Sequence, residues 1–482
     1  MPDTPLPFPA LRRSAPRSAR RRLATVAAAC LLAGCFGSDE SPVSSPSDVR
    51  YAYVLLGENG QAVARAITMA GTCPAIAVDG GSPVQMSLRA PAATLPPRPT
   101  AFDANNAVPA SFPVTVCDAP LPAGAARASI GLRDLPLPKR HPQKILLIGD
   151  TGCRMKADGS ESLYQACSDP QQWPFRALAE LAAAQAPDVV IHVGDYHYRE
   201  TACPPGNAGC AGSPYGFSWS SWEPDFFAPG QALLAAAPWV LVRGDHETCD
   251  RGGQGWWRLL DPRPLAPQQD CNDPANDGIG NYSDPYGVPL DDDMMFVVFD
   301  SAVVGTKALK PADAQYQLYA QQFAKAFALG ATRPNAFFMN HQPIIGYNSD
   351  GKPKAQPGNA ALQSVLESIV PSVLFPPNVQ AVLSGHVHMM QIVTFSTPQP
   401  PIFVPGNGGT MLVEDFTSFP SDNTPLPGAV VANLLHTASF GFMTMERAAS
   451  GWTITAFDRT GRPQTTCALF ARKASCTPLA VS

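Results

Sequence analysis

Residues 144–150 read KILLIGD, an apolar run that ends directly in a glycine and a carboxylate. Similar runs that end in polar residues are DVVIHVGD (188–195), PWVLVRGD (238–245), MMFVVFD (294–300), NAFFMNH (335–341) and VQAVLSGH (379–386). Continuous apolar runs, rather than alternating ones, indicate strands that are buried on both faces. The six segments therefore predict the strands of a layered α/β domain.

Helical patterns lie between these runs, notably over Pro174–Gln185, Ala312–Ala328 and Ala360–Val370. Layered α/β domains of this kind bind their ligands at the carboxyl ends of the strands. The polar residues that end the runs are therefore candidates for a common site.

Residues 50–138 have a different texture. Short apolar runs such as Tyr51–Leu56, Val84–Leu88 and Phe112–Val116 are interrupted by Gly, Pro and Asn, which is typical of a small all-β sandwich. The Pro-rich stretch 136–142 predicts a stiff linker, so a second and larger domain is expected from residue 143 to residue 482.

Residues 1–34 have the layout of a secretory signal. Three arginines at 20–22 precede an apolar run, Leu23–Ala33, that is too short to span a bilayer comfortably. The run leads into Leu-Ala-Gly-Cys, which resembles the bacterial lipobox and predicts a lipid on Cys35; an ordinary signal with a chance cysteine is the alternative. Residues 35–49 predict a flexible tether. We therefore expect an exported chain that its lipid anchors to the membrane of a bacterial cell envelope, at the outer membrane or the periplasmic face.

Removal of residues 1–34 leaves 28 Lys and Arg against 38 Asp and Glu, a net charge of −10. A nucleic-acid surface would need a basic stripe, so this balance predicts no nucleic-acid surface. An anionic substrate would have to be attracted by local positive charge, which metal ions can supply.

The chain has 12 cysteines, of which ten remain when Cys30 in the signal and Cys35 are set aside. An even number in an exported chain indicates disulfides, and the absence of a CxxC pair makes a zinc site a weak alternative. The sequence alone leaves the connectivity open. Sequence order suggests that neighbours pair: Cys73–Cys117, Cys153–Cys167, Cys203–Cys210, Cys249–Cys271 and Cys467–Cys476.

Carboxylate, phenol and imidazole side chains stand at the ends of five predicted strands. In chain order they are Asp150; Asp195 with Tyr198; Asp245 with His246 and Glu247; His341; and His386 with His388. Any one of them could be an ordinary turn or core residue. Oxygen and nitrogen ligands that converge from separate strands, however, suit a pair of metal ions, which a bridging carboxylate can hold about 3.5–4 Å apart.

This ordered set resembles the calcineurin-like metallophosphoesterases over about residues 145–410, and within them the purple acid phosphatases. Two details carry the second resemblance. The first motif, Asp150-Thr-Gly, lacks the histidine that many relatives have two residues after the aspartate, and Tyr198 follows Asp195 by three residues. The resemblance implies a layered β-sandwich flanked by helices, preceded by a fibronectin-like module at 50–138.

The resemblance also implies a role for each residue of the set. Fe(III) would be bound by Asp150, Asp195, Tyr198 and His388. A divalent ion (Fe, Zn or Mn) would share Asp195 as a bridge and be bound by Asp245, His341 and His386. His246 would donate a proton to the leaving oxygen, and Glu247 would have a supporting role. The loop Pro405–Gly409 resembles a Gly-rich turn of the family, unless it is a plain tight turn.

The implied reaction is hydrolysis of phosphate esters, above all small phosphomonoesters as in an acid phosphatase, by a hydroxide that the two metals activate. A phosphodiesterase or nucleotide hydrolase at the same site is one alternative. The other is a surface-anchored binding lipoprotein whose enzyme domain has degenerated. No motif indicates the natural substrate or the oligomeric state.

One residue departs from the family, which has asparagine where this chain has Asp245. The additional negative charge makes the metal pair less positive. We therefore expect Asp245→Asn to tighten phosphate binding and to move the pH optimum downward. The alternative is a site that holds a different metal or is impaired.

The nearby histidines and aromatic residues have ordinary structural explanations. His192 lies inside an apolar strand and is expected to be packed, whereas His197, between two tyrosines, could face the pocket or the solvent. Core packing is favoured over a substrate mouth for the aromatic stretch Phe217–Phe227 and for Trp256 with Trp257.

Overall fold

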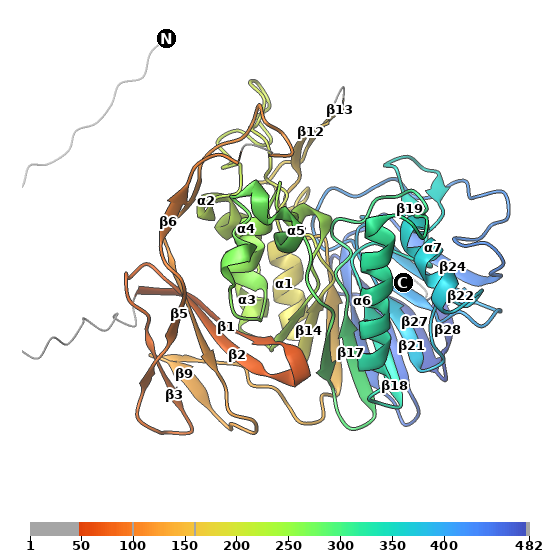
Figure 1. Ribbon diagram of the computed structural model, residues 1–482, viewed down its shortest axis with the longest axis horizontal. Coiled ribbons are helices and arrows are strands. Elements are labelled where there is room, and N and C mark those ends of the chain that lie inside the picture. Colours follow the sequence, from red (N-terminus) through yellow and green to blue (C-terminus); the bar gives the residue numbers. More distant parts are fainter. Residues whose placement is uncertain (1–47, 99–100, 159–160, 479–482) are drawn as a thin grey trace, which may run out of the picture. The chain divides into compact units, whose positions relative to one another are not determined.

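The computed structural model describes residues 48–98, 101–158 and 161–478 (Figure 1). The predicted signal, Cys35 and nearly all of the predicted tether lie outside these residues. Within them, no helix combines the length and the apolar character that a membrane span requires.

Two large sheets form the centre of the fold. The first has 11 strands, in the order β28 (Lys473–Pro478), β27 (Pro463–Phe470), β26 (Trp452–Asp458), β25 (Gly441–Arg447), β11 (Lys144–Ile148), β14 (Val189–His192), β15 (Trp239–Leu241), β1 (Val49–Leu56), β2 (Ala62–Thr68), β8 (Thr115–Pro120) and β5 (Ser87–Ala90). The second has seven, in the order β16 (Tyr286–Pro289), β17 (Met294–Val298), β18 (Asn335–Met339), β21 (Val379–Leu383), β23 (Ile402–Pro405), β22 (Met390–Phe395) and β24 (Val431–Thr437).

Helices cover the outer face of each sheet (Figure 1). The first sheet packs against α1 (Phe175–Ala184), α2 (Trp219–Trp222), α3 (Gln231–Leu234) and α4 (Gly253–Gly255), and the second against α6 (Ala314–Gly330) and α7 (Ala360–Ile369). Along β11, Ile145 and Leu147 enter the core between the sheets, whereas Leu146 and Ile148 pack in the cluster that contains α1. This burial on both faces explains the continuous apolar runs, and the predicted layered β-sandwich flanked by helices is confirmed.

All six predicted strands are present, as β11, β14, β15, β17, β18 and β21. β11, β14 and β15 are parallel neighbours in the first sheet, and β17, β18 and β21 are parallel neighbours in the second. Their carboxyl ends consequently meet along one edge of the two-sheet core. The three predicted helices are α1, α6 and α7, and the Asn359 side chain caps α7 by accepting from the Leu362 backbone N–H.

The N-terminal segment consists of strands, as expected. A four-stranded sheet, β10 (Arg133–Asp134), β9 (Ala128–Ile130), β3 (Ala75–Val78) and β4 (Val84–Gln85), accompanies β1, β2, β8 and β5. These last four strands do not form a sheet of their own, because β1 pairs in parallel with β15 at Leu55 and Trp239. The segments predicted as two domains therefore share one sheet; the division into domains at 50–138 and 143–482 stays a prediction.

The five disulfides join the cysteines that are neighbours in the sequence, as suggested: Cys73–Cys117, Cys153–Cys167, Cys203–Cys210, Cys249–Cys271 and Cys467–Cys476. Disulfides form and persist in oxidising compartments, so this number is typical of an exported protein.

Two hairpins and the C-terminal strands complete the fold. The loop between β6 (Ala93–Leu95) and β7 (Ala110–Phe112) reaches the segment after β15, where the Phe102 backbone N–H donates to the Asp250 carbonyl over 2.9 Å. The other hairpin, β12 (Met155–Asp158) with β13 (Glu161–Tyr164), follows β11. Other short elements include α5 (Asp277–Gly280), the helical turn Asp245–Glu247 and the pair β19 (Asn348–Ser349) and β20 (Ala355–Gln356). Strands β25 to β28 were not predicted from the sequence.

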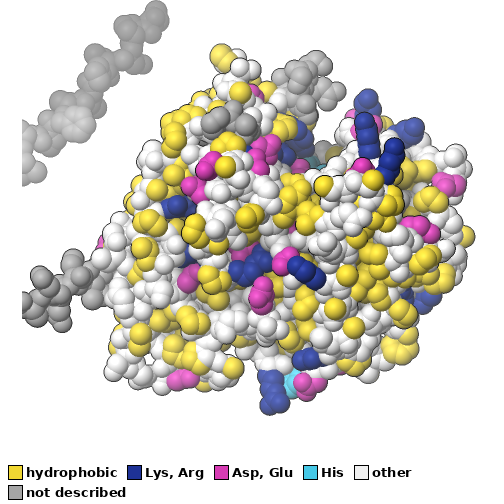
Figure 2. Space-filling view, in the orientation of Figure 1, with side chains coloured by type: hydrophobic (Ala, Val, Ile, Leu, Met, Phe, Trp, Pro, Cys, Tyr) yellow, Lys and Arg dark blue, Asp and Glu magenta, His cyan; other side chains and the backbone are white. Residues whose placement is uncertain are grey.

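The surface carries mixed charge. On the face drawn in Figure 2, the Lys and Arg side chains of the described residues lie in small groups beside acidic ones, not in a continuous stripe. This face lacks the pattern that nucleic-acid binding needs; for the rest of the surface that absence stays a prediction.

Candidate metal centre

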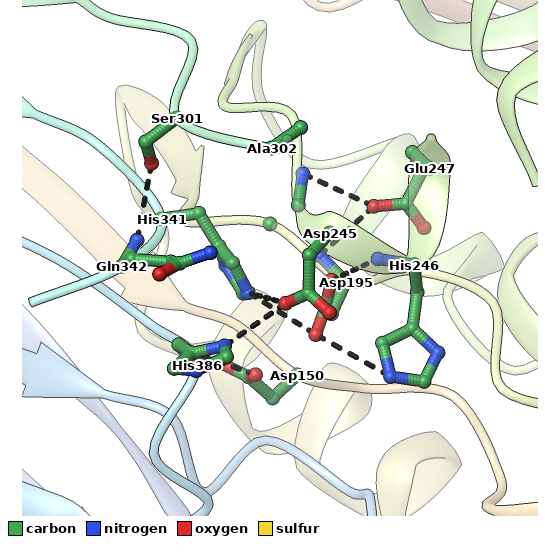
Figure 3. A network of polar contacts seen from close by, with 12 residues as sticks. Asp150, Asp195, Asp245, His246, Glu247, Ser301, Ala302, His341, Gln342 and His386 are labelled. Carbon is green, nitrogen blue, oxygen red and sulfur yellow. Dashed lines mark hydrogen bonds and ion pairs between the residues drawn. The ribbon is translucent and has the colours of Figure 1, made fainter. Parts of the chain in front are cut away.

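The polar strand-end residues of both sheets come together at one place (Figure 3). Asp150, Asp195 and Asp245 follow β11, β14 and β15, and His341 and His386 follow β18 and β21. Parallel strand order alone brings the ligands of each sheet together, and the packing of the two sheets brings the two sets into contact.

The first group of possible ligands consists of Asp195, Asp245, His341 and His386, whose ligand atoms lie within 4.8 Å of one another. His341 Nε2 is 3.1 Å from both Asp195 Oδ2 and Asp245 Oδ1, and His386 Nδ1 is 2.9 Å from Asp245 Oδ1. His341 Nδ1 is 2.9 Å from the Val193 carbonyl. That carbonyl accepts the Nδ1 proton, which leaves Nε2 free to bind a cation.

The second group consists of Asp150, Asp195 and His388, with ligand atoms again within 4.8 Å. The Tyr198 phenol oxygen joins it, at 2.7 Å from Asp195 Oδ2, 2.8 Å from His388 Nε2 and 3.3 Å from Asp150 Oδ1. His388 Nδ1 is fixed by the Met411 carbonyl at 2.8 Å. Because Asp195 belongs to both groups, one carboxylate can serve two ions.

The chemistry of these donors fits metal ions. The Asp150 and Asp195 side chains are at most 1% exposed, and burial raises the pKa of Asp150 well above its ordinary value. Burial, and then the carboxylates of Asp195 and Asp150, raise the pKa of Tyr198 in the same way. Several buried acids side by side are costly unless cations compensate them. Carboxylate, phenolate and imidazole together suit hard to borderline metal ions.

The backbone around the site is unusual for the residues that it carries. Asp150, Asp195 and His386 have φ of 54°, 59° and 70°, in the left-handed region that non-glycine residues rarely adopt. A side chain on Gly385, which precedes His386, would place its Cβ 2.7 Å from Asp150 Oδ2. The glycines of the Gly-Asp and Gly-His pairs thus allow the strand ends to approach each other closely. Backbone with positive φ at non-glycine residues is often found at functional sites.

His246, the predicted proton donor, is buried beside both groups. Its Nε2 is 4.0 Å from Asp195 Oδ2, its ring centroid is 3.8 Å from that of Tyr198, and its Nδ1 is 3.0 Å from Glu200 Oε1. Burial, and then the nearby charge of Arg251, lower the pKa of His246. Sequence reasoning missed Glu200 and Arg251, because neither lies at a strand end or in a recognisable motif.

Glu247 connects two of the strand ends. Its carboxylate accepts from the backbone N–H groups of Asp195 at 3.1 Å, Tyr196 at 2.9 Å and Gly244 at 3.1 Å. It makes no contact with His341 or His386 among the hydrogen bonds of the described residues. These contacts are those of a residue that supports Asp195 and Asp245 and does not itself face the ions.

The loop 405–409 packs behind Asp150. The Gly408 N–H donates to the Gly149 carbonyl at 3.0 Å, and the Thr410 N–H donates to the Asp150 carbonyl at 2.9 Å. A Cβ on Gly408 would collide with the Gly149 carbonyl. The loop therefore does more than turn the chain, since it holds the first strand end in place.

Three expectations about flanking residues can be compared with the structure. His192 is packed, with Nε2 3.0 Å from Thr151 Oγ1 and its ring stacked on Tyr196, as predicted. The expectation that His197 faces pocket or solvent is wrong: it is fully buried, and its Nε2 lies 3.1 Å from Ser221 Oγ. The chain after Asp195 turns into the protein, and burial lowers the pKa of His197 to about 4. Core packing is confirmed for the buried tryptophans Trp219, Trp222, Trp256 and Trp257.

One side of the site is open to solvent. The side chains of Asp245 and His386 are 24% and 30% exposed. The side chains of Asp150, Asp195, His246, His341 and His388 are at most 7% exposed. A substrate would therefore approach from the side of Asp245 and His386.

The sequence pattern of the calcineurin-like phosphoesterases matches residues 143–390. The chain belongs to this family. Every predicted ligand and His246 lie within the matched residues. A calcineurin-like phosphoesterase hydrolyses phosphate esters at a metal site, and the two ligand groups around Asp195 provide one.

One solved structure shows the same fold at low sequence identity, and a second is similar at a lower TM-score. The purple acid phosphatase PPD1 from yellow lupin (Lupinus luteus) seeds is 15% identical, with a TM-score of 0.51 over 89% of this chain and 74% of that one. A structure of PhoD is 11% identical, with a TM-score of 0.47 over 89% of this chain and 92% of that one. No curated protein matches the sequence.

Proposed function

We propose that this phosphoesterase is an acid phosphatase that hydrolyses phosphomonoesters with Fe(III) beside a divalent ion (Fe, Zn or Mn). The position of the Tyr198 phenol oxygen carries the proposal, because it lies within 2.8 Å of both Asp195 Oδ2 and His388 Nε2. A phenolate is a hard anionic ligand, which a trivalent ion favours more strongly than a divalent one does. Asp150, Asp195, Tyr198 and His388 would hold the iron, and Asp195, Asp245, His341 and His386 the divalent ion.

When bound, the two ions supply positive charge for the phosphoryl oxygens and activate the attacking water. The protein residues orient the substrate and move the proton. His246 donates a proton to the leaving oxygen, while Glu200 at 3.0 Å holds Nδ1 and opposes the lowering of the His246 pKa that burial and Arg251 cause. The phosphate enters past Asp245 and His386, the two exposed ligands.

Metal analysis and the visible spectrum of residues 36–482 test the metal assignment. We expect about two metal ions per chain, including iron, and a tyrosinate charge-transfer band that Tyr198→Phe abolishes. Two colourless ions would keep the phosphoesterase but reject Fe(III) at Tyr198. Protein that binds no metal in iron- and zinc-replete medium would reject the enzyme and favour a binding lipoprotein.

Substrate and proton donor are tested together. We expect p-nitrophenyl phosphate to be hydrolysed faster than bis(p-nitrophenyl) phosphate; the reverse order would make the chain a phosphodiesterase. His246→Gln should slow alkyl phosphates more than p-nitrophenyl phosphate, because only a poor leaving group needs the proton. His436→Gln, away from the ligand groups, is the control. Equal losses for both ester types would reject His246 as the donor.

Lipid attachment at Cys35 is part of the same proposal. The five disulfides and the Leu-Ala-Gly-Cys sequence support export to an envelope in which the enzyme stays bound to the membrane. Mass spectrometry of the N-terminal peptide should find a diacylglycerol on Cys35, and Cys35→Ala should release the protein. An unmodified cysteine would contradict the anchor.

A further inference from the structure

Arg251 is a buried cation beside the metal centre to which the proposed function gives no role. Its Nη1 donates to Asp245 Oδ2 at 3.0 Å, and its Nε donates to Glu200 Oε1 at 2.6 Å. Its Nη2 lies within 2.8 Å of the ring nitrogens of His246. Arg251 therefore contacts both a predicted metal ligand and the predicted proton donor.

The two oxygens of Asp245 have different partners. Oδ1 faces His341 Nε2 at 3.1 Å and His386 Nδ1 at 2.9 Å, which are ligand atoms of the first group. Oδ2 faces the Arg251 guanidinium. An asparagine at position 245 would have one oxygen and one N–H₂ group. The N–H₂ group would face either Arg251, which is itself a donor, or the metal ion, which needs a lone pair. The aspartate and the arginine consequently fit one another as a pair.

The Asp245–Arg251 pair is shielded from water on the arginine side. The Arg251 side chain is 7% exposed, and its guanidinium lies 4.8 Å from the ring centroid of Phe102. Phe102 comes from the loop between β6 and β7, so the N-terminal segment covers this part of the site. An ion pair in such surroundings is screened far less than one at the surface.

We propose that Asp245 and Arg251 act as one ligand unit, in which Arg251, held on its other side by Glu200, offsets part of the Asp245 carboxylate charge and keeps Oδ1 directed toward the divalent ion. Arg251 is thus a positioning residue that sets the charge of the centre. This inference rests on the proposed function, because it requires a divalent ion at Asp245. It also bears on the charge question that the aspartate raises, since Arg251 offsets part of the negative charge that Asp245 adds where the family has asparagine.

A double-mutant cycle of Asp245→Asn and Arg251→Gln tests the pair. The readouts are the dissociation constant of Zn²⁺ from metal-stripped protein, measured against a chelator, and the inhibition constant of inorganic phosphate for the loaded enzyme. Arg251→Gln should tighten Zn²⁺ and weaken phosphate, and Asp245→Asn should do the opposite, each by about tenfold. The double variant should stay within about threefold of Asp245→Asn alone, because Arg251→Gln has no carboxylate charge to expose once Asp245 is replaced; additive single effects would instead return it to the wild-type value.

Two variants control for a merely structural effect. Arg251→Lys keeps the charge but loses the guanidinium fork that spans Glu200 and Asp245, so its Zn²⁺ affinity should lie between those of wild type and Arg251→Gln. Arg154→Gln removes another guanidinium beside the centre, 3.3 Å from His388 Nδ1, and should show no coupling with Asp245→Asn.

The possible failures can be told apart. Additive effects, or a shift of both single variants in the same direction, in a wild type that binds metal and hydrolyses phosphate esters would overturn the Asp245–Arg251 unit alone. A wild type that binds no metal and hydrolyses no phosphate ester would overturn both the proposed function and this inference.

Discussion

Two of the clusters of buried charge among the described residues are built in opposite ways. In the N-terminal segment, the Asp118 carboxylate accepts hydrogen bonds from Arg65 Nε at 2.7 Å, Arg65 Nη2 at 2.8 Å and Arg89 Nη1 at 3.1 Å. Two cations thus surround one carboxylate. At the metal centre three carboxylates converge, and Arg251 is the single Lys or Arg that pairs with any of them among the ion pairs of the described residues.

The difference separates a structural cluster from a functional one. The spare donors of Arg65 and Arg89 reach the backbone carbonyls of Leu259 and Trp257, so that cluster attaches the first strands to the segment after α4. The charges of this cluster are paired with one another and need no ion from outside. The metal centre, in contrast, keeps its negative charge and its lone pairs for ions that come from outside, at a cost to the stability of the metal-free protein.

Asp195→Asn should have the largest effect, because Asp195 belongs to both ligand groups. We expect kcat/KM to fall by at least about 10³-fold, more than the loss of a single electrostatic donor usually costs. Metal analysis of the purified variant should find less than the two ions expected for wild type.

A substitution at another carboxylate of the site, Asp150→Asn, should not destabilise the metal-free protein. Burial raises the pKa of Asp150 well above its ordinary value, so its charge is costly there, and the urea midpoint of metal-stripped Asp150→Asn should equal or exceed that of wild type. A clear fall in this midpoint would show that the site is built like the Asp118 cluster, and the comparison would be wrong.

Asp118→Asn should have the reverse pattern. It leaves the buried Arg65 and Arg89 without their counter-charge, which costs about 3 kcal/mol of unfolding free energy when one partner of a buried pair is lost. Urea unfolding measures this loss, and metal content should stay at the wild-type value. Asp134→Asn, in the exposed pair with Arg127, is the control and should leave the midpoint unchanged. Equal midpoints for the two variants would contradict the structural role of Asp118.

The sequence was sufficient to predict that the strand-end side chains converge, because each stands directly after an apolar run that is typical of a buried strand. Asp150, Asp195 and Asp245 follow three parallel neighbours, so strand order alone places them together. Tyr198 was included because its spacing from Asp195 resembles the family pattern. The left-handed backbone at Asp150 and Asp195 could not be predicted in the same way, because its single trace in the sequence is the glycine before each aspartate.

The charge partners could not be predicted in this way. Arg65 and Asp118 are brought together by the register between β2 and β8, which pairs these two residues directly. Arg251 reaches Asp245 because the chain after the short helical turn Asp245–Glu247 folds back on itself. The pairing of β1 with β15 likewise depends on the packing of two segments far apart in sequence, which local patterns do not record.

The smallest expected effect concerns the pH dependence of stability. Burial alone would raise the pKa of Asp118, but the charges of Arg65 and Arg89 outweigh it and hold this pKa below its ordinary value of about 3.9. A group whose pKa is lower in the folded state stabilises the fold above its unfolded pKa, and this contribution is lost as the pH falls through the folded pKa. The gap in urea midpoint between wild type and Asp118→Asn should therefore be constant from pH 7 to about pH 5 and shrink below about pH 4.

Metal-stripped and metal-loaded protein should show the same gap, since Asp118 and its arginines have no contact with the ligand groups in the described residues. The absolute midpoints should differ, because ions that bind the folded state stabilise it by mass action. A gap that changes with metal loading would mean that the two clusters are coupled through the shared sheet. In that case the Asp118 cluster and the metal centre would unfold as one cooperative unit.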